Sequence, residues 1–405
     1  MILNHKSLLL SAVCILSFCL SLPYMVTNIL ILCCTLLAFW GLIFDPKSYS
    51  FRKMSSFLLV LFAVELIGLS FTTDMNSGLS HIEKKSVFFL LPLVFSMNDL
   101  SSKHNIWKIW DFYLLGILVV ILYCFFFAIY RVYSGEEAGM WGVNEFFTLK
   151  LPSAVNMSHV QFGLNVSIAL LFSIHQFFCI SIERQTKKLF YGASFIILSV
   201  ILVLIMAKTA IIATFVAVAW ILIVSKGINV SKLLIVSSIF VFFFATAIVL
   251  FPPLKSRWEQ ILSSKETVLV NDKRNYYSTR VTTLSCAFKI AQENFLTGIG
   301  TGDSRRFLNN CYIESGMNDF MDYDSHCQYL DYIIRLGILG IAALIFVLIT
   351  PFVYSLFYNR DILQTCIFGI LILCLFTENM FDISKGVLAY SFFYCFLTSS
   401  NNLNS

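Results

Sequence analysis

The sequence predicts an all-α protein that crosses a membrane many times, and three observations support this fold class. Of the 405 residues, 58% are hydrophobic and only 13% are charged, whereas soluble domains carry about 25% charged residues. Apolar runs recur from one end of the chain to the other, which favours membrane helices over barrel strands. One long polar stretch, residues 252–327, interrupts these runs.

We expect about twelve membrane-spanning helices. Their expected ranges are 8–23, 26–44, 54–72, 84–98, 110–131, 159–180, 188–206, 209–225, 232–251, 328–350, 361–377 and 384–398. The first range could pass for a signal peptide, but it lacks a clear small-residue cleavage site and a second span follows at once, so we expect it to be retained. The chain then divides into helices 1–9 (residues 1–251), a helical loop domain (252–327) and helices 10–12 (328–405).

The positions of Lys and Arg predict the orientation of the chain. The connections on one side of the expected helices, together with Lys6, carry twelve cations, and the short connections on the other side carry six. Because cytoplasmic loops are enriched in Lys and Arg, we expect both termini in the cytoplasm and the 252–327 loop outside. The net charge of +5 is modest and does not indicate a nucleic-acid partner.

Three cations on the expected outer side are candidates for holding an anionic ligand. Lys84 and Lys85 stand at the start of the fourth expected span, and Lys208 lies in the short turn after residue 206. A lysine near membrane depth costs about 2.5–3.5 kcal/mol unless something offsets it. Such a lysine either extends its ammonium group to the membrane interface or holds an anion, and both alternatives stay open.

The loop contains a predicted helix from about Arg280 to Asn294, with Ser278 or Thr279 as its N-cap. Apolar residues recur on one face at steps of three or four, and they are Val281, Leu284, Phe288 and Ala291. Arg280 shares that face, so we expect it to point toward the surface on which the helix docks. A packed salt bridge is the alternative to a ligand contact. GIGTG at 298–302 ends the helix and lacks the lysine of a nucleotide-binding Walker loop.

His326 stands just before the tenth expected span, whose first-turn N–H groups favour anions. A histidine changes its protonation state near neutral pH, so His326 can act as a general base or donate to a phosphate. A capping or interfacial histidine is the alternative, as it is for His159 at the start of the sixth span. Asp324 can orient His326, and Glu378 at the end of the eleventh span can pair with a cation or simply end that span.

Two further patterns in the loop concern metal binding and disulfides. Asp322-Tyr323-Asp324 matches the D-x-D arrangement that holds a divalent metal, but three-residue patterns often arise by chance, and we expect neither a metal nor a cofactor. Nine of the twelve cysteines lie in or beside apolar runs, where Cys is usually a small buried hydrophobe. The others are Cys286, Cys311 and Cys327, two of which can pair if the loop faces an oxidising compartment.

Four of these motifs also carry a resemblance to a known family. Arg280–Leu284 reads R-x3-L before ENFLTGIGTG, and His326–Gly340 reads H-C-x9-G-x-x-G. MAKTA surrounds Lys208, and NMSHVQFG surrounds His159. Together they resemble the O-antigen ligase/polymerase superfamily. Cys327 stands where the family commonly has Asn, Ser or Gln, Lys208 stands where many members have Arg, and Val160 replaces a proline.

The resemblance implies a metal-independent, inverting glycosyltransferase in a bacterial inner membrane, with its site facing the periplasm. It implies a glycan donor on undecaprenyl pyrophosphate and, for a ligase, a lipid A core acceptor. Arg280 and Lys208 would hold the pyrophosphate, with Lys84 or Lys85 as a weaker helper. His326 would take the proton of the acceptor hydroxyl or donate to the phosphate.

Three alternatives to this ligase hypothesis remain. A polymerase of the same superfamily would join one glycan to another, and a related ligase would glycosylate a protein. The non-enzyme alternative is a flippase or transporter of lipid-linked glycans, which we expect to carry charges along its spans. The expected spans are almost uncharged, with Glu65 and Glu378 as exceptions, while polar residues gather in the loop. This distribution favours surface chemistry over passage.

Overall fold

The computed structural model describes residues 5–50, 53–134, 145–148, 150–180, 184–226 and 276–399, and their regular secondary structure is helical. Five of these helices are long and apolar enough to cross a membrane. They are α2 (Tyr24–Phe44), α6 (Lys103–Ser134), α8 (His159–Cys179), α9 (Gln185–Ile205) and α15 with its C-terminal extension (Gln328–Asn359). The prediction of an all-α membrane protein is therefore confirmed, whereas the number of twelve spans stays a prediction.

Shorter helices occupy most of the other expected spans. They are α1 (His5–Cys19), α3 (Leu58–Leu69), α10 (Lys208–Lys226), α16 (Ile362–Cys374) and α17 (Ser384–Ser399). A perpendicular crossing of a bilayer takes about 20 residues, so the helices well below that length cannot cross alone at full thickness. The ninth expected span, 232–251, and the first part of the loop domain, 252–275, lie outside the described residues.

The fourth expected span, 84–98, is wrong as a single helix. The chain forms α4 (Met75–Lys85) and then α5 (Val87–Val94), which has only eight residues and contains Pro92. The Asp74 side chain accepts a hydrogen bond from the Ser77 N–H at 3.0 Å and so caps the start of α4. Residues that the sequence assigned to a connection are therefore helical, and the apolar run after them is too short to span a bilayer.

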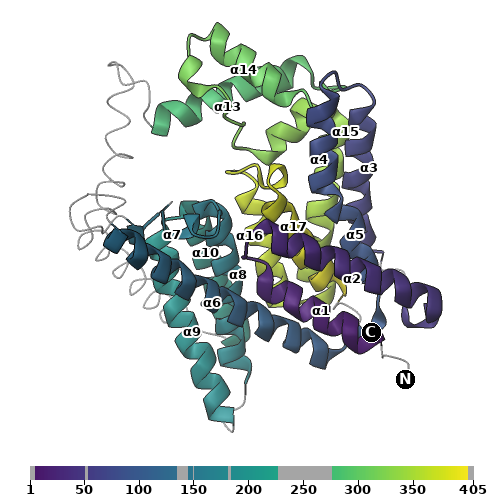
Figure 1. Ribbon diagram of the computed structural model, residues 1–405, viewed down its shortest axis with the longest axis vertical. Coiled ribbons are helices and arrows are strands. Elements are labelled where there is room, and N and C mark those ends of the chain that lie inside the picture. The colour runs from purple at the N-terminus through teal and green to yellow at the C-terminus, as the bar shows by residue number, and fades with distance from the viewer. Residues whose placement is uncertain are drawn as a thin grey trace.

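Helices α13 (Tyr276–Glu293) and α14 (Ser304–Glu314) form a layer at one end of the molecule, beside the upper ends of α3, α4 and α15 (Figure 1). α13 begins at Tyr276, so the predicted N-cap at Ser278 or Thr279 is wrong and both residues lie inside the helix. A Cys286–Cys311 disulfide joins the two helices, while Cys327 is free and buried. The structure thus selects one of the pairings that the sequence left open.

The tenth expected span is broken where the sequence predicted a continuous helix. Gly337 inside α15 has φ 59° and ψ −147°, which is not helical. A Cβ there would lie 2.6 Å from the Leu296 carbonyl oxygen, so both the backbone conformation and the close approach require glycine. The carbonyls of Ile334 and Arg335 instead accept hydrogen bonds from the N–H groups of Ile299 (2.9 Å) and Gly300 (3.0 Å). The GIGTG segment therefore closes the break in α15.

The same loop segment is anchored to α3 and to the turn between α3 and α4. The Thr301 side chain donates to the carbonyl of Glu65 at 2.8 Å. Asp303 accepts hydrogen bonds from the Thr73 N–H (2.7 Å) and hydroxyl (2.6 Å) and from the Asp74 N–H (3.2 Å). Burial alone would raise the pKa of Asp303, but these donors and the Arg306 charge hold it below its ordinary value. The ionised Asp303 carboxylate thus fixes the loop on the membrane helices.

Beneath this anchor lies a buried ion pair between Lys85 of α4 and Glu65 of α3, with both side chains fully buried. The Lys85 ammonium also lies 5.3 Å from the centre of the Tyr332 ring. An isolated buried charge is very unfavourable, whereas a paired one is tolerated. Lys85 therefore joins α4 to α3, and its ammonium is not available to a ligand from outside.

We predict that Lys85→Met destabilises the fold by about 3–5 kcal/mol, because it leaves the Glu65 carboxylate buried without its partner. The measurement is the thermal midpoint and folded yield of the purified protein in detergent. The double variant Glu65→Leu/Lys85→Met should recover most of the loss, and Lys84→Met is the matched control. If Lys85→Met protein folds like wild type but no longer binds the donor, Lys85 contacts the ligand and its pairing with Glu65 is not its main role.

Candidate active site at the junction of the loop and the membrane helices

Arg280 of α13 contacts the segment that joins α16 to α17 (residues 375–383, called the α16–α17 segment). Its Nη1 donates to the Thr377 carbonyl oxygen at 2.8 Å, and its Nη2 lies 3.3 Å from Oε1 of Glu378. The Arg280 side chain is 22% exposed.

The predicted docking face of α13 is wrong, because Val281, Leu284 and Phe288 are exposed. The helix instead buries the face that carries Cys286, Ala287 and Ile290, and Arg280 reaches the α16–α17 segment beside it.

His326 lies beside the same glutamate. Its Nδ1 is 3.2 Å from Oδ1 of Asp324 and 3.8 Å from Oε2 of Glu378. The His326 backbone has φ 49°, and its N–H donates to Asp324 at 2.9 Å. A left-handed conformation at a non-glycine residue is uncommon and is concentrated at functional sites. Nδ1 therefore faces two carboxylates, which leaves Nε2 as the ring nitrogen that does not face an acid.

Two acids therefore surround one imidazole. Burial raises the pKa of Asp324 above its ordinary value, although the neighbouring His326 and the hydrogen bond from its N–H oppose that shift. Glu378 shares its two oxygens between Arg280 and His326. A proton taken up by the imidazole would be stabilised by both carboxylates, so the arrangement can accept a proton and hold it.

Hydrogen bonds hold the His326 turn against the α16–α17 segment. The Ser325 hydroxyl accepts from the Asn379 side chain at 3.0 Å. The Gln328 N–H donates to the Leu375 carbonyl at 2.9 Å, and the Gln328 side chain accepts from the Phe381 N–H at 2.7 Å. Cys327, which stands where the family that the sequence resembles commonly has a polar residue, is buried. Gln328 and Ser325 therefore supply the polar contacts on either side of it.

The structure also contains a buried charged group that the sequence analysis missed. Arg335 of α15 pairs with Asp331 at 3.1 Å and with Asp382 at 2.6 Å, and it contacts Ser304 and His81, each at 3.1 Å. The charges in the tenth expected span contradict the expectation that only Glu65 and Glu378 interrupt the spans. An acid and an arginine four residues apart on a membrane helix were the available signal.

The charge of Arg335 sets the protonation of its neighbours. Burial alone would raise the pKa of Asp382, but the Arg335 charge lowers it to about 2. Arg335, together with burial, lowers the pKa of His81 to about 2, so this histidine is neutral and its Nδ1 accepts from the guanidinium. Burial likewise lowers the pKa of Lys84, and the charges of Asp382 and Arg335 act on it. Lys84 is therefore one of the charged residues near the Arg335 group.

Lys208 and His159 begin two neighbouring helices. α8 starts at His159, and α10 starts at Lys208, two residues after Met206 turns the chain with φ 53°. A Cβ on Gly163 would lie 2.5 Å from the Cβ of Ala207, so the first turns of these helices are in close contact. The MAKTA and NMSHVQFG motifs, 40 or more residues apart in the chain, are therefore packed together.

One hydrogen bond relates this pair of helices to the His326 site. Lys385, in the first turn of α17, donates to the carbonyl of Val155, just before His159 at the start of α8. Because α17 directly follows the α16–α17 segment, the starts of α8 and α10 and the Glu378 region lie at the same end of the helix bundle. Arg280, Glu378, His326 and Asp324 are in direct contact there, while Lys208 and His159 lie at that end of the bundle.

The D-x-D pattern does not form one site. The Asp324 carboxylate faces His326, whereas Asp322 is exposed, with φ 70°, and its N–H donates to the Asn309 side chain at 2.9 Å. Within the ranges that the structure describes, no three His, Cys, Asp or Glu side chains are grouped in a way that could hold a metal ion.

Comparison with known proteins places this site in a family. Residues 193–345 match a family model described as O-antigen ligase, and no curated protein matches the chain at a significant level. The matched range contains Lys208, Arg280 and His326 and extends past the break at Gly337. The apolar helices and this match together indicate a membrane protein that contains an O-antigen ligase domain over residues 193–345.

Proposed function

We propose that the protein is a metal-independent, inverting glycosyltransferase of the O-antigen ligase type, acting in lipopolysaccharide biosynthesis. Its donor is a glycan on undecaprenyl pyrophosphate, and its acceptor is the lipid A core. It lies in a bacterial inner membrane with both termini in the cytoplasm, so that α13 and α14 face the periplasm. The observation that carries the proposal is the contact of Arg280, Glu378, His326 and Asp324 at the edge of the membrane helices.

The proposed reaction is a single displacement at the anomeric carbon of the donor. The oxygen of an acceptor hydroxyl forms a bond to that carbon while the bond to the pyrophosphate oxygen breaks, so the configuration inverts. The proton of the hydroxyl passes to Nε2 of His326. Asp324 and Glu378 beside Nδ1 stabilise the imidazolium that forms.

The leaving lipid pyrophosphate gains negative charge as the bond breaks, and fixed cations stabilise that charge. Arg280 supplies one cation, although it shares its charge with Glu378. Lys208 supplies the second from the start of α10, where the N–H groups of a helix end also favour anions. Lys84 is a weaker helper, and Lys85 is removed from this set because of its pair with Glu65.

The carboxylates favour one of the two roles that the sequence left open for His326. Two acids beside Nδ1 would repel an approaching phosphate, but they stabilise a histidine that takes up a proton. The base role therefore fits the surroundings of His326 better than donation to the phosphate.

We predict that His326→Ala lowers glycan transfer by about 10²–10⁴-fold, the usual contribution of a general base. Arg280→Ala should cost about 10²–10³-fold, the loss expected for one stabilising donor. Arg280→Lys should recover only part of it, because lysine cannot make a bidentate contact. Membranes containing each variant are supplied with lipid-linked glycan and lipid A core in EDTA, and the product on the core is measured.

Lys289→Ala is the matched control, because Lys289 forms an exposed pair with Glu314 at 3.6 Å, and such pairs contribute little. Long glycan ladders without core product would establish a polymerase instead. Loss of wild-type transfer in EDTA would contradict metal independence. If neither wild type nor any variant transfers glycan, but the lipid-linked glycan still crosses the bilayer, the protein would be a transporter and not an enzyme.

A second prediction concerns pH. The raised pKa of Asp324 means that its carboxylate takes up a proton at a higher pH than an ordinary aspartate does. As the pH falls, the Asp324 carboxylate becomes protonated and no longer stabilises an imidazolium beside it, so transfer should decrease. Asp324→Asn removes this titrating carboxylate, so the decrease of kcat on the acid side should move to lower pH and the plateau should fall by about tenfold.

Asp322→Asn is the control for the pH experiment, because Asp322 is exposed and two residues from Asp324. The profile of Asp322→Asn should match that of wild type. An Asp324→Asn profile with an unchanged acid limb and an unchanged plateau would show that Asp324 does not act on the histidine.

A further inference from the structure

Lys84 and Arg305 are two cations near the His326 site that have no acidic partner among the described residues. Lys84 lies near the end of α4 and is partly buried, and Arg305 is an exposed residue in the first turn of α14. The adjacent Lys85 and Arg306, by contrast, each pair with a carboxylate. Cations at a surface that no nearby acid neutralises attract an anion.

The Arg335 group brings these two cations together. Arg335 contacts His81 of α4 and Ser304 of α14, each at 3.1 Å. Lys84 follows His81 by three residues, on the same face of α4, and Arg305 follows Ser304 directly. Burial lowers the pKa of Lys84, and the Arg305 charge acts in the same direction. Two cations that repel each other are stabilised when an anion binds between them.

His81 adds a hydrogen-bond donor beside the two cations. The guanidinium of Arg335 donates to Nδ1 of His81, so the neutral ring carries its proton on Nε2. The His81 side chain is 14% exposed. Asp382, on the same ring, is paired with Arg335 at 2.6 Å, which offsets its repulsion of an anion. We call His81, Lys84 and Arg305 the α4–α14 rim.

The rim lies at one end of the α16–α17 segment, and Arg280 lies at the other. Asp382 is 3.8 Å from Nδ1 of His81, whereas Glu378 is 3.3 Å from Arg280. Both acids are close enough to Asp324 for their charges to act on its pKa, which burial raises. The acids that surround the catalytic histidine are therefore between the rim and Arg280.

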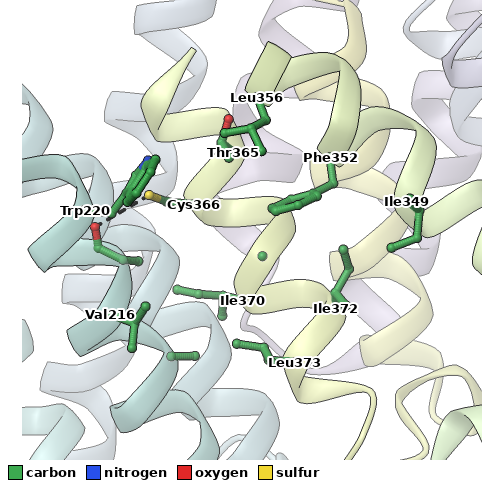
Figure 2. Close-up of a pocket in the computed structure, with 13 residues that line it drawn as sticks. Val216, Trp220, Ile349, Phe352, Leu356, Thr365, Cys366, Ile370, Ile372 and Leu373 are labelled. Atoms are coloured by element: carbon green, nitrogen blue, oxygen red, sulfur yellow. Dashed lines mark hydrogen bonds between the residues drawn. The ribbon is translucent and has the colours of Figure 1, made fainter. Parts of the chain in front are cut away.

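An apolar pocket elsewhere in the molecule does not suit an anion. It has a volume of about 440 Å³ and lies between α10, α15 and α16, with Val216, Trp220 and Phe352 among its lining side chains (Figure 2). None of the side chains that line it is charged, so an anion there would lose its water without compensation. The rim instead offers the cations and the N–H donor that form charge-assisted hydrogen bonds to phosphate or carboxylate.

We infer that the α4–α14 rim binds an anionic group, a phosphate or a carboxylate, on the acceptor saccharide and directs the acceptor hydroxyl toward His326. The inference rests on the proposed function. In an inverting displacement the attacking oxygen and the leaving group lie on opposite faces of the sugar ring. With the leaving pyrophosphate at Arg280, the acceptor approaches from the other end of the α16–α17 segment, where the rim lies.

The inference gives the acceptor a chemical property. Its saccharide carries negative charge close to the hydroxyl that becomes glycosylated, and a neutral saccharide of the same shape is a poorer acceptor. Lys84 then contacts the acceptor, and it helps the pyrophosphate only through its charge at a distance.

The test measures the binding of fluorescently labelled lipid A core to the full-length protein in phosphatidylcholine nanodiscs, without donor. Lys84→Met and Arg305→Met should each weaken binding by about tenfold, the change that about 1.4 kcal/mol of binding produces. Lys84→Arg keeps the charge and should bind nearly as wild type does. Lys289→Met is the matched control, because it removes a cation from the exposed pair with Glu314 in the same helix layer, and its binding should be unchanged.

The ligand is varied in the same assay. Removal of the core phosphates or reduction of the core carboxylates should weaken wild-type binding by about the same factor. The remaining binding should then be insensitive to Lys84→Met, because both changes remove one contact. Binding that neither treatment nor either variant weakens would overturn the inference. Phosphatidylglycerol in the nanodisc that displaces the core would equally overturn it, since the rim would then hold a lipid headgroup.

The outcome separates the rim from the proposed reaction. Binding needs no donor, so wild-type protein that binds the core through the rim but transfers nothing would contradict the reaction and leave the rim as a binding site. In active protein, Lys84→Met and Arg305→Met should raise the KM for the core and leave the KM for the donor unchanged. A raised donor KM with an unchanged core KM would overturn the inference and leave the reaction standing.

Discussion

The α16–α17 segment, residues 375–383, is the element on which the rest of the structure depends. At one end it accepts Arg280 on the Thr377 carbonyl and shares Glu378 between Arg280 and His326. At its other end Asp382 neutralises Arg335, which lies buried in α15. An unpaired charge at that depth would be very unfavourable, so loop, membrane helices and candidate site have to assemble around this segment together. The position of the imidazole is therefore set by contacts from three separate parts of the chain.

Local patterns predicted the individual helices well. The apolar runs at 159–180, 188–206 and 209–225 are bounded by charged or turn-forming residues, and α8, α9 and α10 agree with them to within about three residues. The fourth and tenth spans failed for a physical reason. Pro92 and Gly337 are compatible with an apolar run, and only the contact of Gly337 with Leu296, 41 residues away, forces the break. Periodicity along one segment carries no information about such a contact.

In the candidate site, too, local sequence patterns predicted some features, and contacts between distant residues decided the others. Arg280, Asp324, His326 and Glu378 could each be singled out because charged residues beside a membrane span need an explanation, and the structure brings these four together. The different surroundings of the two lysines could not be predicted, because Lys84 and Lys85 are adjacent in sequence. Lys85 is buried against Glu65, whereas Lys84 is close enough to Asp382 for that charge to act on its pKa. The Arg335 group was missed because Asp382 and His81 come from distant parts of the chain.

The central claim is that the His326 site performs one displacement on a lipid-linked glycan. The most direct test is the anomeric configuration of the new linkage, measured by NMR on product made in a single turnover by purified protein in proteoliposomes with chelator. A single displacement predicts that the configuration of the donor is inverted in all of the product. Product that retains the donor configuration would require a covalent glycosyl intermediate, and it would contradict the proposed role of His326 as the base that activates the acceptor hydroxyl.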